Sequence, residues 1–436
     1  MMVKFLKEGG FLPFTTGILM LVAVSHTTAQ ITELEPQLQD HIRAALTDNL
    51  DLDSWTERVT ASEKRISQAG AWQDPMLTVG LMNLPVNSFD FNQEPMTGAW
   101  ITLSQSIPLT DRYSTQRDIA TLSTERVETE LLVRQFDIAG SIGEAWYDWT
   151  FYRAAVATLD STIEVLDQFL QIAGSKYETG SGLLQDLFKI ETEQARLLDK
   201  RAVLAQMAKT TGERVAILLG RDPLDVPPAP GSIPQQFTPL TDIGLDSLLI
   251  KDSPTLASTR TGLEITRRQL DLKKSLRWPN LNLNAGYGYR QDAADGMSRP
   301  DFFSLTAGIS IPVFGSAKQG AAVEEAAAVS RERQSQLNNQ LLQLRFALQA
   351  LLDEDLRLDE QITIYSSNLL PLATATVSAS ISTYSVNKTD IEALLMAQTA
   401  LFNSRLELID RLRDRAKTRV RIAALVGSSE LILRDE

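Results

Sequence analysis

The residue types that most often perform chemistry in proteins are scarce in this chain of 436 residues. It has no cysteine and only two histidines, His26 and His41, which excludes disulfides, thiolate nucleophiles and a histidine metal cluster. Serine, histidine and aspartate do not occur in a pattern typical of nucleophilic catalysis. We therefore expect no enzyme, and we assign no catalytic, cofactor-binding or metal-binding residue.

Methionine is the remaining soft donor. Met76, Met82 and Met96 could in principle bind a metal such as Cu(I). They are spaced along a predicted strand and loop, which favours ordinary surface and packing roles. The formal net charge of -13 also makes nucleic acid an unfavourable partner.

Two stretches near the middle of the chain alternate strictly between apolar and polar residues, over residues 281–290 and 303–311. Each is about as long as a tilted strand that crosses a bilayer, which indicates a membrane hairpin, and a half-buried strand pair of a soluble sandwich is an equal alternative for this hairpin alone. The residues predicted to face lipid are Leu281, Leu283, Leu305, Ile309 and Ile311.

The hairpin has a counterpart earlier in the chain. A shift of 204 positions aligns residues 101–108 with residues 305–312, so the sequence contains an internal duplication with hairpins at about 75–108 and 281–312. Four strands cannot close a membrane barrel, because the smallest such barrels have about eight strands. The strand count therefore predicts an oligomer whose identical subunits share one barrel.

Long helices follow each hairpin. No proline interrupts residues 112–176, which predicts one helix of about 60 residues. A turn at 177–182 and a returning helix at about 183–219 complete a helical hairpin, and the second repeat has equivalent helices at about 319–383 and 389–426. The second long helix has gained three residues and contains Pro371, so we expect a local change of winding and a bend.

The remaining segments complete the predicted organisation. Residues 1–29 have basic residues, an apolar run and a small-residue ending typical of a secretory signal peptide; an anchor helix is the alternative. The first repeat spans 30–220 and opens with helices at 31–50 and 52–70. Proline is concentrated in a connector at 221–253, whose apolar piece 243–250 either packs on the long helices or is part of a linker. The second repeat spans 254–436 and opens with a helix at 255–277.

This layout resembles the outer-membrane efflux protein (TolC) family over nearly the whole chain after residue 29. The specific motifs are Ile107-Pro108 and Ile311-Pro312 at the strand ends and the turn pattern that joins Tyr177, Gly180 and Asp186. The resemblance implies a homotrimer in the outer membrane of a Gram-negative bacterium. It implies a twelve-stranded barrel in outer-membrane lipid, a periplasmic helical tunnel, and partners that are a periplasmic adaptor and an inner-membrane pump of the RND or ABC class.

The resemblance also implies a gate at the periplasmic end. Its pair is Tyr384 of the second repeat and Asp186 of the first, with Gln185 beside it, and Lys388 and Glu392 are secondary candidates. A phenol that donates to a carboxylate is a bond that can break without a large desolvation cost. The alternative is that Asp186 is a solvated charge near a turn.

The sequence departs from the family at this gate. Thr389 stands where the family has arginine, and Ala393 and Met396 stand at the positions of an acidic ring. The first hairpin is similar to members that partner heavy-metal efflux pumps.

Two functions are therefore compared. The first is a passive exit duct of an efflux or secretion system, and the second is a soluble periplasmic adaptor or scaffold. Long helical hairpins suit both, but only the first needs alternating strands.

Overall fold

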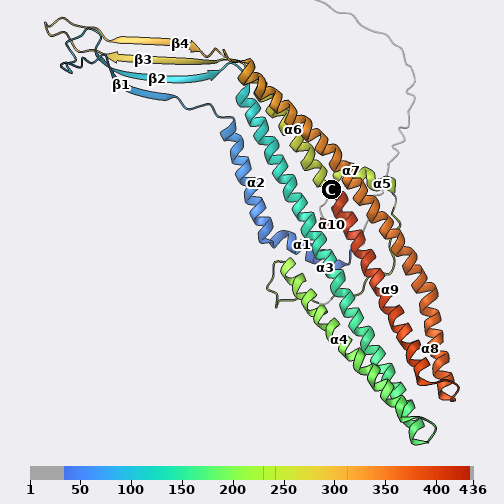
Figure 1. Cartoon of the computed structure of the whole chain (residues 1–436). Coiled ribbons are helices and arrows are strands. Elements are labelled where there is room, and N and C mark those ends of the chain that lie inside the picture. Colours follow the sequence, from blue (N-terminus) through green and yellow to red (C-terminus); the bar gives the residue numbers. More distant parts are fainter. Residues whose placement is uncertain (1–33, 229, 241, 312, 433–436) are drawn as a thin grey trace, which may run out of the picture.

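The computed structural model describes residues 34–228, 230–240, 242–311 and 313–432. The predicted signal peptide, 1–29, lies outside these ranges, as does Pro312 of the second hairpin. A four-stranded sheet forms one end of the molecule, and long helices extend from it to two hairpin tips at the other end (Figure 1).

All four strands form one antiparallel sheet in the order β1-β2-β3-β4. The central pair, β2 and β3, joins the two repeats, and β1 and β4 are the edges. The strands are β1 (Met76–Met82), β2 (Gly98–Pro108), β3 (Asn280–Tyr289) and β4 (Phe302–Ile309).

The register separates the two faces of the sheet. One row across all four strands consists of Val79, Ile101, Tyr287 and Phe303, whose side chains are between 50% and 74% exposed. The next row consists of Thr78, Thr102, Gly286 and Ser304. The predicted alternation is therefore confirmed: one face is apolar and open, and the other is mainly polar.

The predicted lipid-facing residues follow this pattern, with one correction. Leu281 lies opposite Ile309, Leu283 opposite Ala307, and Leu305 opposite Ala285, all on the apolar face. Ile311 lies beyond the end of β4 at Ile309. The sequence continues with proline, which has no amide hydrogen for a further ladder bond.

Helix α3 (Arg112–Glu178) contains 67 residues and is about 100 Å long at 1.5 Å per residue. It packs against α2 (Leu50–Ala69), α4 (Leu184–Leu218), α6 (Pro254–Ser275) and α9 (Ile391–Val426). This lateral packing buries apolar side chains along most of α3, which is how a helix of this length remains stable in water.

Two shorter helices begin the described chain, α1 (Pro36–Asp48) and α2. Asn49 separates them, and its side chain accepts a hydrogen bond from the Asp51 amide at 2.9 Å. None of the described helices combines the length and the apolar character needed to cross a membrane.

The second repeat differs from the first in its long helix. In place of one helix the structure has α7 (Ala321–Ile364), a π-helical turn at Tyr365–Leu369 and α8 (Leu370–Ser385). Pro371 cannot donate to the carbonyl of Ser367, which lies in that turn. A wide turn accommodates extra residues within a helix, and another at Ser316–Gly320 precedes α7. The predicted local change of winding therefore occurs at two π-helical turns, one before α7 and one between α7 and α8.

The connector packs on the long helices. Helix α5 (Asp242–Asp252) contacts α7 and α9, and its Leu245 and Leu249 are fully buried. Arg345 of α7 makes two bonds to Asp246, at 2.9 and 3.0 Å. Of the two alternatives for this segment, packing is correct. A short helix, α10 (Ser429–Ile432), ends the described chain.

A buried ionic cluster joins α7 to α9. Arg419 holds both carboxylate oxygens of Asp355 at 2.6 and 2.8 Å, and Arg415 donates to the same group at 3.2 Å. All three side chains are at most 8% exposed. Because each charge has a partner, the cluster fixes how these helices pair, whereas loss of one partner would leave a buried charge.

Candidate functional site at the hairpin tips

The turns that end the two helical hairpins lie against each other. The first joins α3 to α4 and includes Gly180, whose φ of 73° suits glycine. The second joins α8 to α9 and includes Asn387, also in the left-handed region at φ 59°. Asp390 begins α9 by accepting from the Ala393 amide at 3.1 Å. These two turns place the predicted residues.

Tyr384 and Asp186 are brought together as predicted. The Tyr384 phenol donates to Asp186 Oδ2 at 3.3 Å. The tyrosine is only 3% exposed and packs in an apolar cluster with Leu166 and Phe169. Burial, together with the nearby Asp186 carboxylate, raises the pKa of Tyr384 to about 12. The phenol is therefore protonated and able to donate at neutral pH.

Lys176, near the end of α3, is a residue that the sequence analysis missed. Its ammonium donates to the Tyr384 carbonyl and, at 2.5 Å, to Asn387 Oδ1. It also lies 4.1 Å from the centre of the Tyr384 ring, a cation–π geometry. The repeat-equivalent position is Thr383, so the duplication contained no signal for this lysine.

A third link connects the hairpins farther along α4 and α9. Lys189 pairs with Glu392 at 3.1 Å, with side chains 35% and 64% exposed. A pair this exposed contributes little to stability. Glu392 thus takes part in the contact between hairpins, but weakly.

The remaining predicted residues lie nearby with different surroundings. Lys388 and Thr389 line the same cavity as Tyr384 and Asp186, with a volume of about 530 Å³. Among the described residues, no hydrogen bond or ion pair engages the Lys388 ammonium. Gln185 lines a separate groove between α4 and α9, beside Glu392.

The two turn tyrosines have different environments. Tyr177, the counterpart of Tyr384, is 47% exposed, and its side chain makes no hydrogen bond within the described ranges. Tyr384 instead fills the space between the hairpins. The site is therefore built from the second-repeat tyrosine and first-repeat charges.

This arrangement suits a reversible mechanical contact. Two hydrogen-bonded groups and one exposed ion pair hold the tips of the first and second hairpins together. Each bond is weak enough to exchange for water. The geometry can tie the tips and release them without covalent chemistry.

The three methionines are not brought together. Met76 and Met82 lie at opposite ends of β1, roughly 20 Å apart at 3.3 Å per residue. Each of the three side chains is at least half exposed: Met76 at 63%, Met82 at 50% and Met96 at 58%.

Comparisons with known proteins agree with this fold. Residues 245–428 match the family model described as outer membrane efflux protein. No curated protein matches the sequence.

Solved structures match along most of the chain. The outer-membrane channel OprN superposes with a TM-score of 0.77 at 17% identity, covering 90% of both chains. The outer membrane protein VceC from Vibrio cholerae gives a TM-score of 0.74 at 17% identity, covering 90% of this chain and 96% of that one. CusC, studied for its folding and transmembrane channel formation, gives 0.73 at 15% identity, covering 90% and 92%. The chain thus shares the fold of these outer-membrane channels over nine-tenths of its length, and its second repeat matches the outer membrane efflux protein family.

Proposed function

We propose that this chain is the outer-membrane exit duct of a tripartite efflux system. It passively conducts substrates that an inner-membrane pump expels through a periplasmic adaptor. The observation that supports this most is the sheet: one face is apolar and exposed, and both edges are unpaired within the described part of the chain. The sheet leads into α3, which is about 100 Å long.

The open edges favour a trimer. Strands β1 and β4 run in opposite directions, so β4 of one copy can pair antiparallel with β1 of the next. Three such sheets make twelve strands and leave no edge. Unpaired backbone groups in lipid cost several kcal/mol each, so closure is a condition of membrane insertion.

The two faces of the sheet then have different surroundings. The row that contains Leu305 and Leu103 would face lipid, and the row that contains Thr306 and Asn284 would face the lumen. Asn284 donates to Thr306 at 3.2 Å, a polar contact suited to a water-filled channel. Residues 1–29 would direct export as a signal peptide.

The hairpin tips would form the gate at the periplasmic entrance. Lys176, Tyr384 and Asp186 hold the tips together by bonds that an adaptor can break when it docks. We propose Lys388 and Glu392 as secondary contributors and place Gln185 in the neighbouring groove. A heavy-metal cargo is a prediction that rests only on the first hairpin, which is similar to members that partner heavy-metal efflux pumps.

The alternative function is a soluble periplasmic adaptor or scaffold. Such a protein would use the helical hairpins but has no use for an exposed apolar face on a sheet with open edges.

Membrane fractionation separates the two functions. The mature chain should require detergent for extraction and should migrate as an oligomer that dissociates on heating. Recovery of a soluble monomer from the periplasm would contradict the duct and favour the adaptor.

A further inference from the structure

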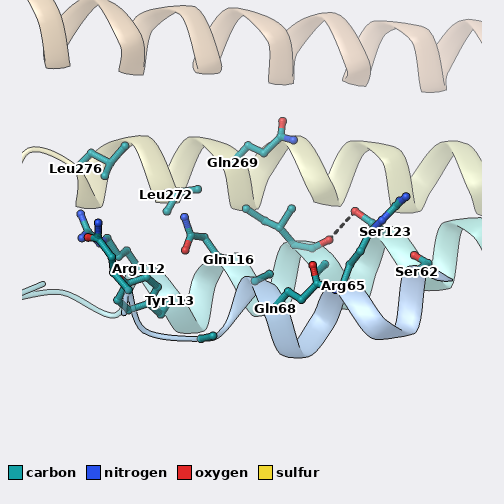
Figure 2. Close-up of a pocket in the computed structure, with 15 residues that line it drawn as sticks. Ser62, Arg65, Gln68, Arg112, Tyr113, Gln116, Ser123, Gln269, Leu272 and Leu276 are labelled. Carbon is teal, nitrogen blue, oxygen red and sulfur yellow. Dashed lines mark hydrogen bonds between the residues drawn. The ribbon is translucent and has the colours of Figure 1, made fainter. Parts of the chain in front are cut away.

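A groove at the base of the sheet is separate from the hairpin tips. It has a volume of about 750 Å³ and lies over α3, between α2 and α6 (Figure 2). Its walls consist mainly of polar side chains from these three helices. Among them are Arg65, Gln68, Arg112, Tyr113, Gln116 and Gln269.

The groove is positively charged in an acidic protein. Two arginines and no aspartate or glutamate line it, although the chain has a net charge of -13. Arg112 lies over the Tyr113 ring at 5.3 Å. Within the described part of the chain, neither Arg65 nor Arg112 forms an ion pair. Their guanidinium groups and the neighbouring amides are therefore free to donate to an anion, and planar guanidinium matches phosphate geometry.

Exposed aromatic residues surround this end of the helices. Trp72, just after α2, is 59% exposed and stacks on Tyr113 with ring centres 6.4 Å apart. Trp278, just before β3, is 67% exposed. Tryptophan and tyrosine concentrate where a membrane protein meets the headgroup region. If the sheet spans the membrane, the groove lies at the depth of lipid phosphates, and this placement rests on the proposed function.

In a trimer closed through the edges of the sheet, the groove would stay open. The contacts place the upper helices side by side in the order α2, α3, α6, α7. Neighbouring subunits would meet the outer helices α2 and α7 of this layer. The groove lies over α3, inside the layer, so such subunit contacts would not fill it.

We propose that this groove binds a phosphate-bearing anion at the junction of the sheet and the helices. Arg112 and Gln116, at the end of the groove beside Leu276, would hold the phosphate oxygens, whereas Arg65 lies toward the Ser123 end and adds positive charge there (Figure 2). Leu272 and Leu276 of α6 supply an apolar wall next to the charged part. This chemistry fits the headgroup of an anionic phospholipid or a soluble phosphate compound.

Calorimetric titration of the detergent-solubilised full chain tests the site. The probes are dihexanoyl-phosphatidylglycerol and, in a separate arm, inorganic phosphate. Arg65→Gln combined with Arg112→Gln should weaken binding by about tenfold or more, as expected for loss of charge-assisted hydrogen bonds. The matched control combines Lys64→Gln with Arg117→Gln, which removes the same charge from α2 and α3 outside the groove lining.

Each outcome decides the proposal. If the Arg65→Gln, Arg112→Gln pair weakens phosphatidylglycerol binding and the control pair does not, the site binds a lipid headgroup. If the same pair weakens only the binding of inorganic phosphate, the site binds a soluble phosphate compound. Equal losses in both pairs of variants, or no binding by the unaltered chain, would overturn it. Size-exclusion chromatography checks that each variant remains assembled. Because binding is measured without ion flow, a failed channel assay would refute the duct without affecting this result.

Discussion

Replacing Lys176 with methionine should open the periplasmic entrance more than removing the Tyr384 hydroxyl. The Tyr384 bond to Asp186 is 3.3 Å long, well beyond the roughly 2.5–2.7 Å of a strong bond to a carboxylate. Its loss in Tyr384→Phe should cost the closed state about 0.5–1.5 kcal/mol, a change of about two- to tenfold in the open-to-closed ratio.

Lys176 makes more contacts. Its ammonium has two acceptors on the opposite turn and lies over the Tyr384 ring. Charge-assisted bonds contribute about 1.5–3 kcal/mol, so Lys176→Met should raise the same ratio by about ten- to a hundredfold. Methionine retains most of the aliphatic stem, so packing should change little.

Single-channel recording in planar bilayers measures these ratios. Tyr177→Phe is the matched control for the tyrosine, because Tyr177 is exposed and lacks the carboxylate contact. Lys209→Met is the control for the lysine, because Lys209 lies on α4 away from the hairpin tips and its side chain is 69% exposed. Asp186→Ala combined with Tyr384→Phe should add little to either change alone. Control variants that open the channel as much as Lys176→Met would refute the proposed gate.

Three further predictions concern the rest of the molecule. Leu305→Arg on the apolar face should destabilise the assembled barrel by about 2–4 kcal/mol, whereas Thr306→Arg should assemble and alter conductance; heat-stability gels and bilayer recordings distinguish them. Asp355→Ala should lower the free energy of unfolding by about 3–5 kcal/mol, because the buried Arg419 and Arg415 lose the carboxylate that they share, and thermal melting measures this. Burial alone would raise the pKa of Glu144, but Arg421 and two neighbouring cations hold that pKa below its ordinary 4.5. Its stabilising contribution is therefore present above pH 4.5 and lost as pH falls through the lowered pKa, so the difference in melting temperature between the unaltered chain and Glu144→Gln should vanish in acid.

The regular elements were predictable because their signals are local. Alternation at every second residue determines which face of a strand each side chain occupies, and the register confirms this across all four strands. The absence of proline from residues 112–176 predicted α3, which has only two further residues at its end. The tyrosine–aspartate contact required the family resemblance, because the residues are 198 positions apart.

The missed features depend on long-range contacts. Lys176 precedes the turn motif and has no counterpart in the other repeat, so only the packing of the two tips reveals its acceptors. The pairing of Asp355 with Arg419 crosses 64 positions, and single-sequence patterns do not specify such partners. The offset between the two repeats showed only that the second long helix contains three extra residues. The structure shows one irregularity of that helix at the π-helical turn before Pro371.

Disulfide trapping tests the shared barrel most directly, since the chain has no cysteine of its own. One cysteine replaces Thr78 on edge strand β1, and a second is scanned along edge strand β4 at Ser304, Thr306 and Gly308, on the same face. A control pair at Thr78 and Thr102, which lie opposite each other within one chain, should link only inside the monomer. After mild oxidation in outer-membrane preparations, we expect at least one edge pair to give covalent dimers and trimers and no larger species. Edge pairs that give only monomers at every position, or ladders that extend beyond three chains, would contradict a trimer closed through β1 and β4.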